Sequence, residues 1–188
     1  LIMSAYMGVA EAAAVIATKA ARKRRGQPET PLLLGEMINN LTTAQMAVDG
    51  MVAITNNWEF APETDTANKI LVRKTIAANA ILATVEKAME TAGGIGFYRK
   101  TGLERLLRDA HAVRYHPLPE KRQQHFTGRL ALDLDPIGDT LDPKLRVAAA
   151  RQSNTKQKPA APRSRRFDFQ RHVFSRFIAQ QNLVCVFP

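Results

Sequence analysis

Three long stretches of the chain carry apolar side chains at every third or fourth position, the spacing of an amphipathic α-helix. They cover residues 1–24, 30–57 and 63–92, and glycine or proline interrupts the pattern between them. Helices of this length would be about 36–45 Å long at a rise of about 1.5 Å per residue. Long helices joined by short loops pack as antiparallel bundles. We therefore predict an all-α fold, an antiparallel bundle of long helices with no strand-rich domain.

Each long helix is expected to bury the face on which its apolar residues recur. In the first helix these residues are Ile2, Ala5, Val9, Ala12, Ala13 and Ile16. In the second they are Leu33, Leu34, Met37, Ile38, Leu41, Ala44, Val48 and Met51. In the third they are Ile70, Leu71, Ile76, Ala77, Ala80, Ile81, Val85 and Met89.

Two shorter helices are predicted downstream, over residues 101–111 and 119–131. The third long helix is broken before them by Gly93-Gly94-Ile95-Gly96. At the start of the second long helix, Thr30 is expected to be the N-cap, with Pro31 at the first helical position.

The formal net charge of +10 would suit a nucleic-acid-binding protein, but it is unevenly distributed. Residues 137–188 carry ten Lys and Arg against three Asp and Glu, a net charge of +7, and the rest of the chain carries only +3. Residues 151–166 have almost no apolar side chains with which to bury surface. We therefore expect a helical bundle over residues 1–135 and a basic, disordered tail over residues 136–188.

The cysteine count, the hydropathy and the histidine spacing indicate the expected compartment and exclude some classes of site. Cys185 is the single cysteine, so no internal disulfide can form, and a reducing cytoplasmic setting is expected. No apolar run reaches the roughly 18 residues that a membrane-spanning helix needs. The histidines lack metal-ligand spacing, so no metal site is predicted. The chain opens at Leu1 within a helical pattern, and we expect a further N-terminal portion before it.

A glycine-rich turn follows the third long helix, in the run Glu90-Thr91-Ala92-Gly93-Gly94-Ile95-Gly96-Phe97. Arg108-Asp109 begins twelve residues beyond Gly96, and the first helix ends in Ala21-Arg22-Lys23-Arg24. Over residues 1–135 this combination resembles the C-terminal helical-bundle domain of the acyl-CoA dehydrogenase family. The resemblance implies FAD-dependent oxidation of fatty-acyl-CoA thioesters at the α,β bond. It also implies that helical and β domains upstream complete the cofactor and substrate sites.

The resemblance implies contacts with FAD for four residues. Gly93 and Gly94 would lie along the adenosine–pyrophosphate part of a cofactor bound mainly by the partner subunit. Glu90 stands where many members place a Gln that hydrogen-bonds the cofactor, and Arg24 matches an Arg that pairs with the pyrophosphate. The residue types suit these roles, because guanidinium offers bidentate donors to phosphate and glycine lets a backbone approach a ligand. A plain helix C-cap at the glycines and solvated charge at Arg24 remain the alternatives.

The chain departs from the family's pattern in two places. Most members carry an aromatic residue and a glycine shortly after the arginine, where this chain has Gln27 and Pro28. Many members place the catalytic glutamate shortly after the Arg-Asp pair, at the position of Pro117 here. Glu120 is the nearby carboxylate that could replace it, and His116 is a second candidate base. A first-turn helix glutamate and an ordinary loop histidine are the non-catalytic explanations.

The resemblance also sets the expected partners. FAD would be shared with other domains or subunits, acyl-CoA would be the substrate, and the chain would form a homo-oligomer, a dimer or a tetramer. Arg108-Asp109 is expected to be structural. Three alternatives stay open: a catalytically inactive structural bundle, another flavin reaction on the same fold, and nucleic-acid binding through the arginine–aromatic run 163–172. Solvated charge is the simpler explanation of that run, so nucleic acid is not the expected partner.

Overall fold

The structure is a computed structural model that describes residues 1–137. Five α-helices follow one another in this part of the chain: α1 (Ile2–Arg22), α2 (Glu29–Thr55), α3 (Thr64–Ala92), α4 (Leu103–His111) and α5 (Glu120–Ala131). Residues 1–137 contain no strand. The predicted all-α fold is confirmed. Apart from positions 136 and 137, the predicted tail over residues 136–188, with Cys185, lies outside the described residues.

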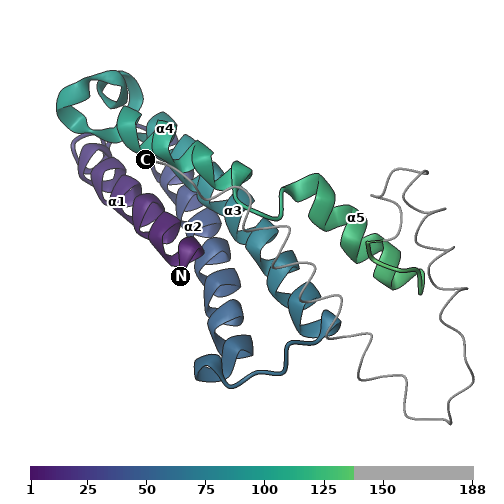
Figure 1. The fold of residues 1–188 in the computed structure, drawn as a ribbon. Coiled ribbons are helices and arrows are strands. Elements are labelled where there is room, and N and C mark those ends of the chain that lie inside the picture. Colours follow the sequence, from purple (N-terminus) through teal and green to yellow (C-terminus); the bar gives the residue numbers. More distant parts are fainter. Residues whose placement is uncertain (138–188) are drawn as a thin grey trace, which may run out of the picture. The chain divides into compact units, whose positions relative to one another are not determined.

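The chain divides into two compact units. The first consists of Leu1–Phe60 and Lys69–Glu120. The second consists of Ala61–Asn68 and Lys121–Pro188, of which residues up to 137 are described. In the first unit α1, α2 and most of α3 share one core and run in alternating directions (Figure 1). α1 packs against both α2 and α4, which makes this unit the predicted antiparallel bundle.

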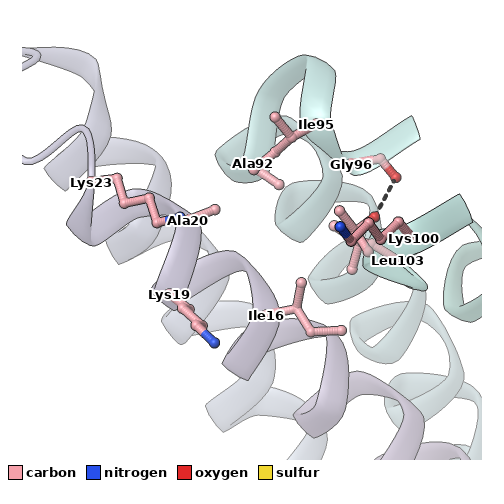
Figure 2. A pocket seen from close by; sticks show the side chains of 10 residues that line it. Ile16, Lys19, Ala20, Lys23, Ala92, Ile95, Gly96, Lys100 and Leu103 are labelled. Atoms are coloured by element: carbon pink, nitrogen blue, oxygen red, sulfur yellow. Dashed lines mark hydrogen bonds between the residues drawn. The ribbon is translucent and has the colours of Figure 1, made fainter. Parts of the chain in front are cut away.

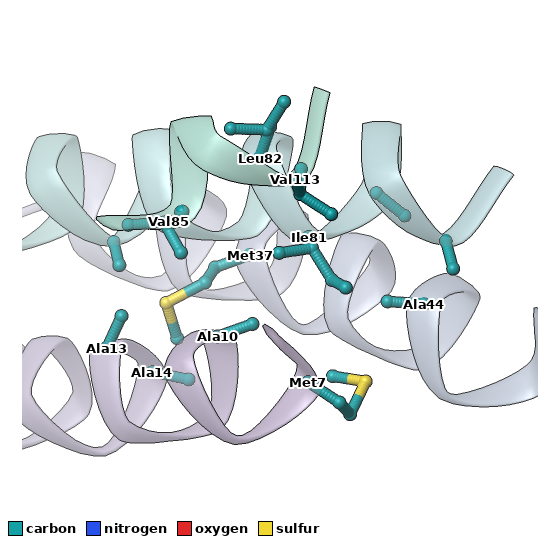
Figure 3. Packing of buried hydrophobic residues seen from close by; sticks show 14 of the residues in the cluster. Met7, Ala10, Ala13, Ala14, Met37, Ala44, Ile81, Leu82, Val85 and Val113 are labelled. Carbon is teal, nitrogen blue, oxygen red and sulfur yellow. The ribbon is translucent and has the colours of Figure 1, made fainter. Parts of the chain in front are cut away.

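Alanine and methionine build most of the core of the first unit. α1 buries Met3, Met7, Ala10, Ala13, Ala14, Ala17, Ala20 and Ala21. Met37 from α2 and Ile81 and Val85 from α3 belong to the same cluster, and none of these three is more than 1% exposed (Figure 3). Small side chains at a helix contact let the two helix axes come close together. Close packing of the helices therefore holds the bundle together. No aromatic side chain belongs to this cluster of buried residues.

The buried face of α1 differs from the predicted one. Ile2 is 46% exposed, and Ala5 and Ala12 are exposed as well. Ile38 of α2 and Ile76 of α3 are also predicted to be buried, but they are 49% and 45% exposed. The prediction is wrong at these positions because the helices meet through their smaller side chains. Ile2, Ile38 and Ile76 are left on the outer faces.

The start of α2 also differs from the prediction. Glu29 is the first helical residue and Pro28 is the N-cap, so Thr30 lies buried inside the first turn. Pro28 already has helical backbone angles, φ −57° and ψ −34°, which lets the helix begin earlier than expected. α2 ends at Thr55, and Asn56 follows with φ 40°, the left-handed conformation that asparagine tolerates at a helix end.

Side-chain hydrogen bonds join the segments of the second unit. Gln123 Nε2 donates to Thr127 Oγ1 over 2.7 Å within α5. Thr127 Oγ1 in turn donates to Asn68 Oδ1 over 2.6 Å. Further along, Arg129 Nε donates to the carbonyl of Asp135 over 2.6 Å. These bonds link α5 to the first turns of α3 and to the segment that follows α5.

Candidate functional site

Arg24 and the glycine-rich turn meet at one end of the bundle. Arg24 follows α1, and its Nη2 donates a hydrogen bond to the backbone carbonyl of Thr91, in the last turn of α3. Carbonyls in the last turn of a helix have no partner within the helix, and the negative end of the helix dipole favours a cation there. Arg24 therefore caps the C-terminus of a helix that lies 67 residues away in the sequence.

Gly93 is the point of closest approach between this arginine and the turn. Its φ is +67°, and a Cβ placed on it would lie 2.9 Å from Arg24 Nη1. The backbone angle therefore favours glycine at this position, and a Cβ there would make the Arg24 guanidinium shift. Gly94 is different: a Cβ there would have nothing within 4 Å, so the backbone at Gly94 is open to solvent.

Glu90 pairs with a lysine on its own helix. Its Oε2 lies 2.6 Å from Lys87 Nζ, and the same Nζ lies 2.8 Å from Oε2 of Glu36 on α2. The hydrogen bonds to Glu36 and Glu90 raise the pKa of Lys87. The structure therefore brings together Arg24 and Gly93, two of the four residues predicted to contact FAD. It gives Glu90 a partner other than Arg24.

A pocket of about 280 Å³ lies beside this turn, between the C-terminal half of α1 and the segment from Ala92 to Leu103. Its apolar lining is Ile16, Ala20, Ala92, Ile95 and Leu103. Three lysines also line it: Lys19, Lys23 and Lys100 (Figure 2). No acidic side chain belongs to the lining, so the pocket suits an anionic group attached to an apolar one. Lys19 and Lys100 do not stand out in the sequence, because exposed lysines are usually only solvated.

The residues that follow the glycines expose large apolar surface. Ile95 is 47% exposed, Phe97 74% and Tyr98 68%. The run between Gly93 and Phe97 is a short 3-10 helix, and Gly96 packs inside it, with a hypothetical Cβ 3.3 Å from Met89 Sδ. Exposed aromatic side chains next to an open backbone are typical of a contact surface.

A second polar group of residues joins α1 to the segment after α4. Tyr6 of α1 has its hydroxyl 2.7 Å from Nε2 of His116. The two rings meet edge to face, with centroids 5.3 Å apart. His116 has φ −68° and ψ 139°, the extended conformation that a residue before proline favours. The proline that ends the local helix therefore also sets the direction of this histidine's backbone.

Lys74 of α3 fixes the same segment from the other side. Its Nζ donates to the carbonyls of His116, over 2.8 Å, and Leu118, over 2.9 Å. Lys74 is only 7% exposed, which is rare for a lysine and costly unless its donors are satisfied. The sequence did show a lysine on an otherwise apolar helix face, but not the carbonyls that it reaches.

The pKa values of this group reflect partial burial. Burial lowers the pKa of His116, and the charge of Lys74 lowers it further. Burial also lowers the pKa of Lys74. The pKa of Tyr6 is raised, first by burial and then by the carboxylate of Asp109. His116 is therefore a neutral imidazole at neutral pH, hydrogen-bonded to a neutral phenol.

The remaining predicted site residues lie elsewhere. Glu120 is the first residue of α5, separated from His116 by three residues. Arg108 Nε lies 3.5 Å from Asp109 Oδ1, and both side chains are exposed at the end of α4. Within residues 1–137, no three His, Cys, Asp or Glu side chains are grouped so that they could hold a metal ion. None of the described helices has a stretch long and apolar enough to cross a membrane.

Comparison with known proteins bears on the same region. The family model described as "Acyl-CoA dehydrogenase, C-terminal domain" matches residues 1–120. No curated protein and no solved structure matches the chain. The matched range begins at the first residue of the chain and covers α1 to α4, with the glycine-rich turn and the Tyr6–His116 pair. The chain therefore belongs to the acyl-CoA dehydrogenase family and carries that family's C-terminal domain.

Proposed function

We propose that this bundle is the FAD-contacting and oligomerisation portion of a flavoprotein that oxidises fatty-acyl-CoA thioesters at the α,β bond. The observation that carries the proposal is the packing of Arg24 against Gly93. It places a guanidinium, an open backbone at Gly94 and the end of α3 within one small region. The family's general dependence on FAD supplies the identity of the ligand.

The residues in this region fit the pyrophosphate of FAD. Arg24 uses one guanidinium nitrogen for the Thr91 carbonyl, and a guanidinium has further donors for phosphate oxygens. Gly94 has free space above its backbone, so a ligand could approach it without meeting a side chain. Lys19, Lys23 and Lys100 add positive charge next to the turn. The negative charge of Glu90 would repel a pyrophosphate, but its carboxylate is paired with Lys87.

The proposed oligomer surface rests on exposed apolar side chains. On α2 these are Leu32, Ile38, Met46 and Val52, between 49% and 70% exposed. Ile38 and Val52 are separated by about four helical turns and so lie on the same side of the helix. Large exposed apolar groups on a soluble helix are commonly covered by a partner. We therefore expect a dimer or a tetramer in which α2 is buried.

Arg24 and the backbone at Gly94 would hold the pyrophosphate of FAD, which would supply an acceptor for the hydride that leaves the β-carbon. This chain would contribute cofactor contacts and subunit packing, and other domains or subunits would contribute the rest of the site. The alternative is a bundle of the same fold that assembles but takes part in no chemistry. The two hypotheses differ in whether Arg24 and Gly94 meet a flavin nucleotide.

FAD fluorescence anisotropy, measured as the chain is added, tests the cofactor part. We expect anisotropy to rise with the wild-type chain, and Arg24→Ala to weaken binding by roughly tenfold or more, because a charge-assisted hydrogen bond is lost. Arg25→Ala is the matched control, since Arg25 is the exposed neighbour. Circular dichroism of each variant checks that the bundle is folded. Equal FAD binding by wild type and Arg24→Ala contradicts the proposal, and so does the absence of FAD binding once the family's N-terminal and middle domains are supplied.

Two further measurements separate the alternatives. Sedimentation of the wild-type chain and of Ile38→Lys tests assembly through α2, and a monomeric variant is expected. Oligomers without any FAD binding would favour the inactive structural bundle. Binding of single-stranded DNA that falls steeply with salt, and disappears when residues 136–188 are removed, would favour the nucleic-acid alternative. FAD retention is then measured again with the family's N-terminal and middle domains supplied.

A further inference from the structure

One wall of the pocket beside the glycine-rich turn is a single face of α1 and its C-terminal cap. Ile16 and Ala20 are four positions apart, as are Lys19 and Lys23, so the four side chains lie on this face. The opposite wall is the segment from Ala92 to Leu103, as Figure 2 shows. None of the four residues proposed to contact FAD belongs to the lining, so a ligand in this pocket would be held by other residues.

The inner part of the pocket is apolar. Ala20, Ala92 and Leu103 are buried side chains of the lining. Ile16 and Ile95 extend the apolar lining toward the surface, where Ile95 is half exposed. Filling such a space with hydrocarbon removes apolar surface from water and so favours binding. The lining therefore selects a ligand that has a hydrocarbon portion.

The rim of the pocket carries positive charge that no described carboxylate neutralises. Lys19, Lys23 and Lys100 are exposed, and they line the pocket from both walls. Within residues 1–137, none of the three forms an ion pair with an acidic side chain. Their ammonium groups attract an anion, and salt weakens this attraction because the lysines are exposed. A head group with one or two negative charges therefore suits the rim.

The volume of the pocket limits the length of the ligand. It is about 280 Å³, near the lower end for small-molecule sites in proteins. An apolar cavity of about 150 Å³ holds one benzene molecule, so this pocket has room for roughly ten non-hydrogen atoms. A straight-chain carboxylate of medium length, such as octanoate, is about this size. FAD and acyl-CoA are several times larger, so neither fits inside as a whole molecule.

We propose that this pocket binds an anionic amphiphile of medium chain length. Its hydrocarbon portion packs between Ala20 and Leu103, and its head group lies among Lys19, Lys23 and Lys100. The head group is a carboxylate or a phosphate, which share the negative charge that lysine attracts. The site goes beyond the proposed function, because its ligand is not the flavin and the oxidation does not require it. Bound ligand joins the end of α1 to the segment after α3 and so stabilises the first unit.

The location of the site is tested by NMR of the full chain with 13C-labelled isoleucine methyl groups, titrated with octanoate. Ile16→Val and Ile95→Val identify the two resonances from the pocket. We expect both to shift along one binding curve, with a Kd on the order of 1 mM or tighter. Ile38 is the control, because it is an exposed isoleucine on α2, away from the lining. Shifts at Ile38 alone, or none at Ile16 and Ile95, overturn the proposal.

The role of the charges is tested with octanamide, which has the same chain but no negative charge, and with charge variants. We expect octanamide to bind roughly tenfold more weakly than octanoate. Lys19→Gln combined with Lys23→Gln should weaken octanoate binding by about threefold to tenfold. Lys121→Gln combined with Arg122→Gln removes the same charge from exposed positions outside the lining, and should match wild type. Equal binding of octanoate and octanamide, or equal binding by the two double variants, overturns the proposal.

The hydrocarbon portion and the head group are tested with ligand series on the folded wild-type chain. Each methylene removed between octanoate and butanoate should weaken binding by about twofold to fourfold, and affinity independent of chain length contradicts the proposal. Octyl phosphate is compared with octanoate, and the tighter of the two identifies the preferred head group.

Addition of FAD to the octanoate complex separates this site from the cofactor contacts. We expect the shifts at Ile16 and Ile95 to remain. Displacement of octanoate by FAD would assign the pocket to the cofactor and overturn the proposal. Octanoate binding by a protein that binds no FAD, even with the family's other domains supplied, would contradict the proposed function alone.

Discussion

The guanidinium of Arg24 lies next to the place where a side chain on Gly93 would be. A Cβ on Gly93 would be 2.9 Å from Arg24 Nη1 and 3.4 Å from Cζ. The same guanidinium bonds the carbonyl of Thr91. This contact joins the end of α1 to the end of α3, and it links the stability of the domain to the region proposed to meet FAD.

Gly93→Ala should destabilise the domain by about 1–3 kcal/mol, because alanine is strained at φ +67° and its Cβ meets Arg24. Gly94→Ala is the matched control, since the added Cβ there meets nothing within 4 Å. We expect its free energy of unfolding to stay within about 0.5 kcal/mol of wild type. Urea unfolding followed by circular dichroism measures both. Equal losses for the two variants would contradict both the backbone strain at Gly93 and its contact with Arg24.

The contribution of Arg24 itself can be separated with a double-mutant cycle. Arg24→Ala removes the bond to the Thr91 carbonyl and should cost about 1–2 kcal/mol. It also removes the steric part of the Gly93→Ala cost, so the two losses should be less than additive. Unfolding free energies of the wild type, both single variants and the double variant give the coupling. Strict additivity would contradict direct contact between the two residues in solution.

Lys74→Met should loosen the segment from Ala112 to Pro119. Methionine has a similar length but cannot donate to the carbonyls of His116 and Leu118. Leaving carbonyls without their donor costs about 1–3 kcal/mol each when they are buried, and less where water can reach them. Hydrogen exchange read by mass spectrometry should show faster exchange in this segment. Lys69→Met on the exposed side of α3 is the control, and matching exchange in both variants would refute the anchoring role.

Protonation of His116 should lower stability in mild acid. Its folded-state pKa is lowered from the usual 6.5, so the unfolded chain binds the proton first as pH falls. The stabilisation is complete above about pH 6.5 and is lost as pH falls through the lowered pKa of the folded state. Urea midpoints between pH 7.5 and pH 5 measure the effect. His116→Gln should show a smaller decrease over this range, and an unchanged slope would contradict the assignment.

The ion pairs of Lys87 should contribute modestly and depend on salt. Lys87 bridges Glu36 and Glu90 at 2.8 and 2.6 Å on the bundle surface. Lys87→Met should lower the melting temperature in dilute buffer, and the difference from wild type should shrink as NaCl screens the pairs.

Glu90→Gln breaks one pair and removes a negative charge near the proposed pyrophosphate contact. If that contact is right, this variant binds FAD more tightly than wild type in the anisotropy assay.

The positions of the helices follow from local sequence patterns. The predicted and observed bounds of the long helices agree within a few residues, because apolar periodicity and breaks such as Gly26 and Pro62 act locally. The identity of the buried face does not follow in the same way. On α1 the alanine–methionine face and the face with Ile2, Ala5 and Ala12 are both apolar, and only contact with α2 and α4 selects between them.

The same distinction between local sequence and helix packing applies to the candidate site. By itself the sequence determined the all-α class, the glycine-rich turn and the family resemblance, because these depend on residue type and spacing along one segment. Tertiary structure alone decided that Arg24 meets Gly93, and that Tyr6 and Lys74 converge on His116. Tyr6 and His116 are 110 positions apart, and nothing in a single sequence indicates that they are in contact. Their contact exists because helix packing brings their two segments within hydrogen-bonding distance.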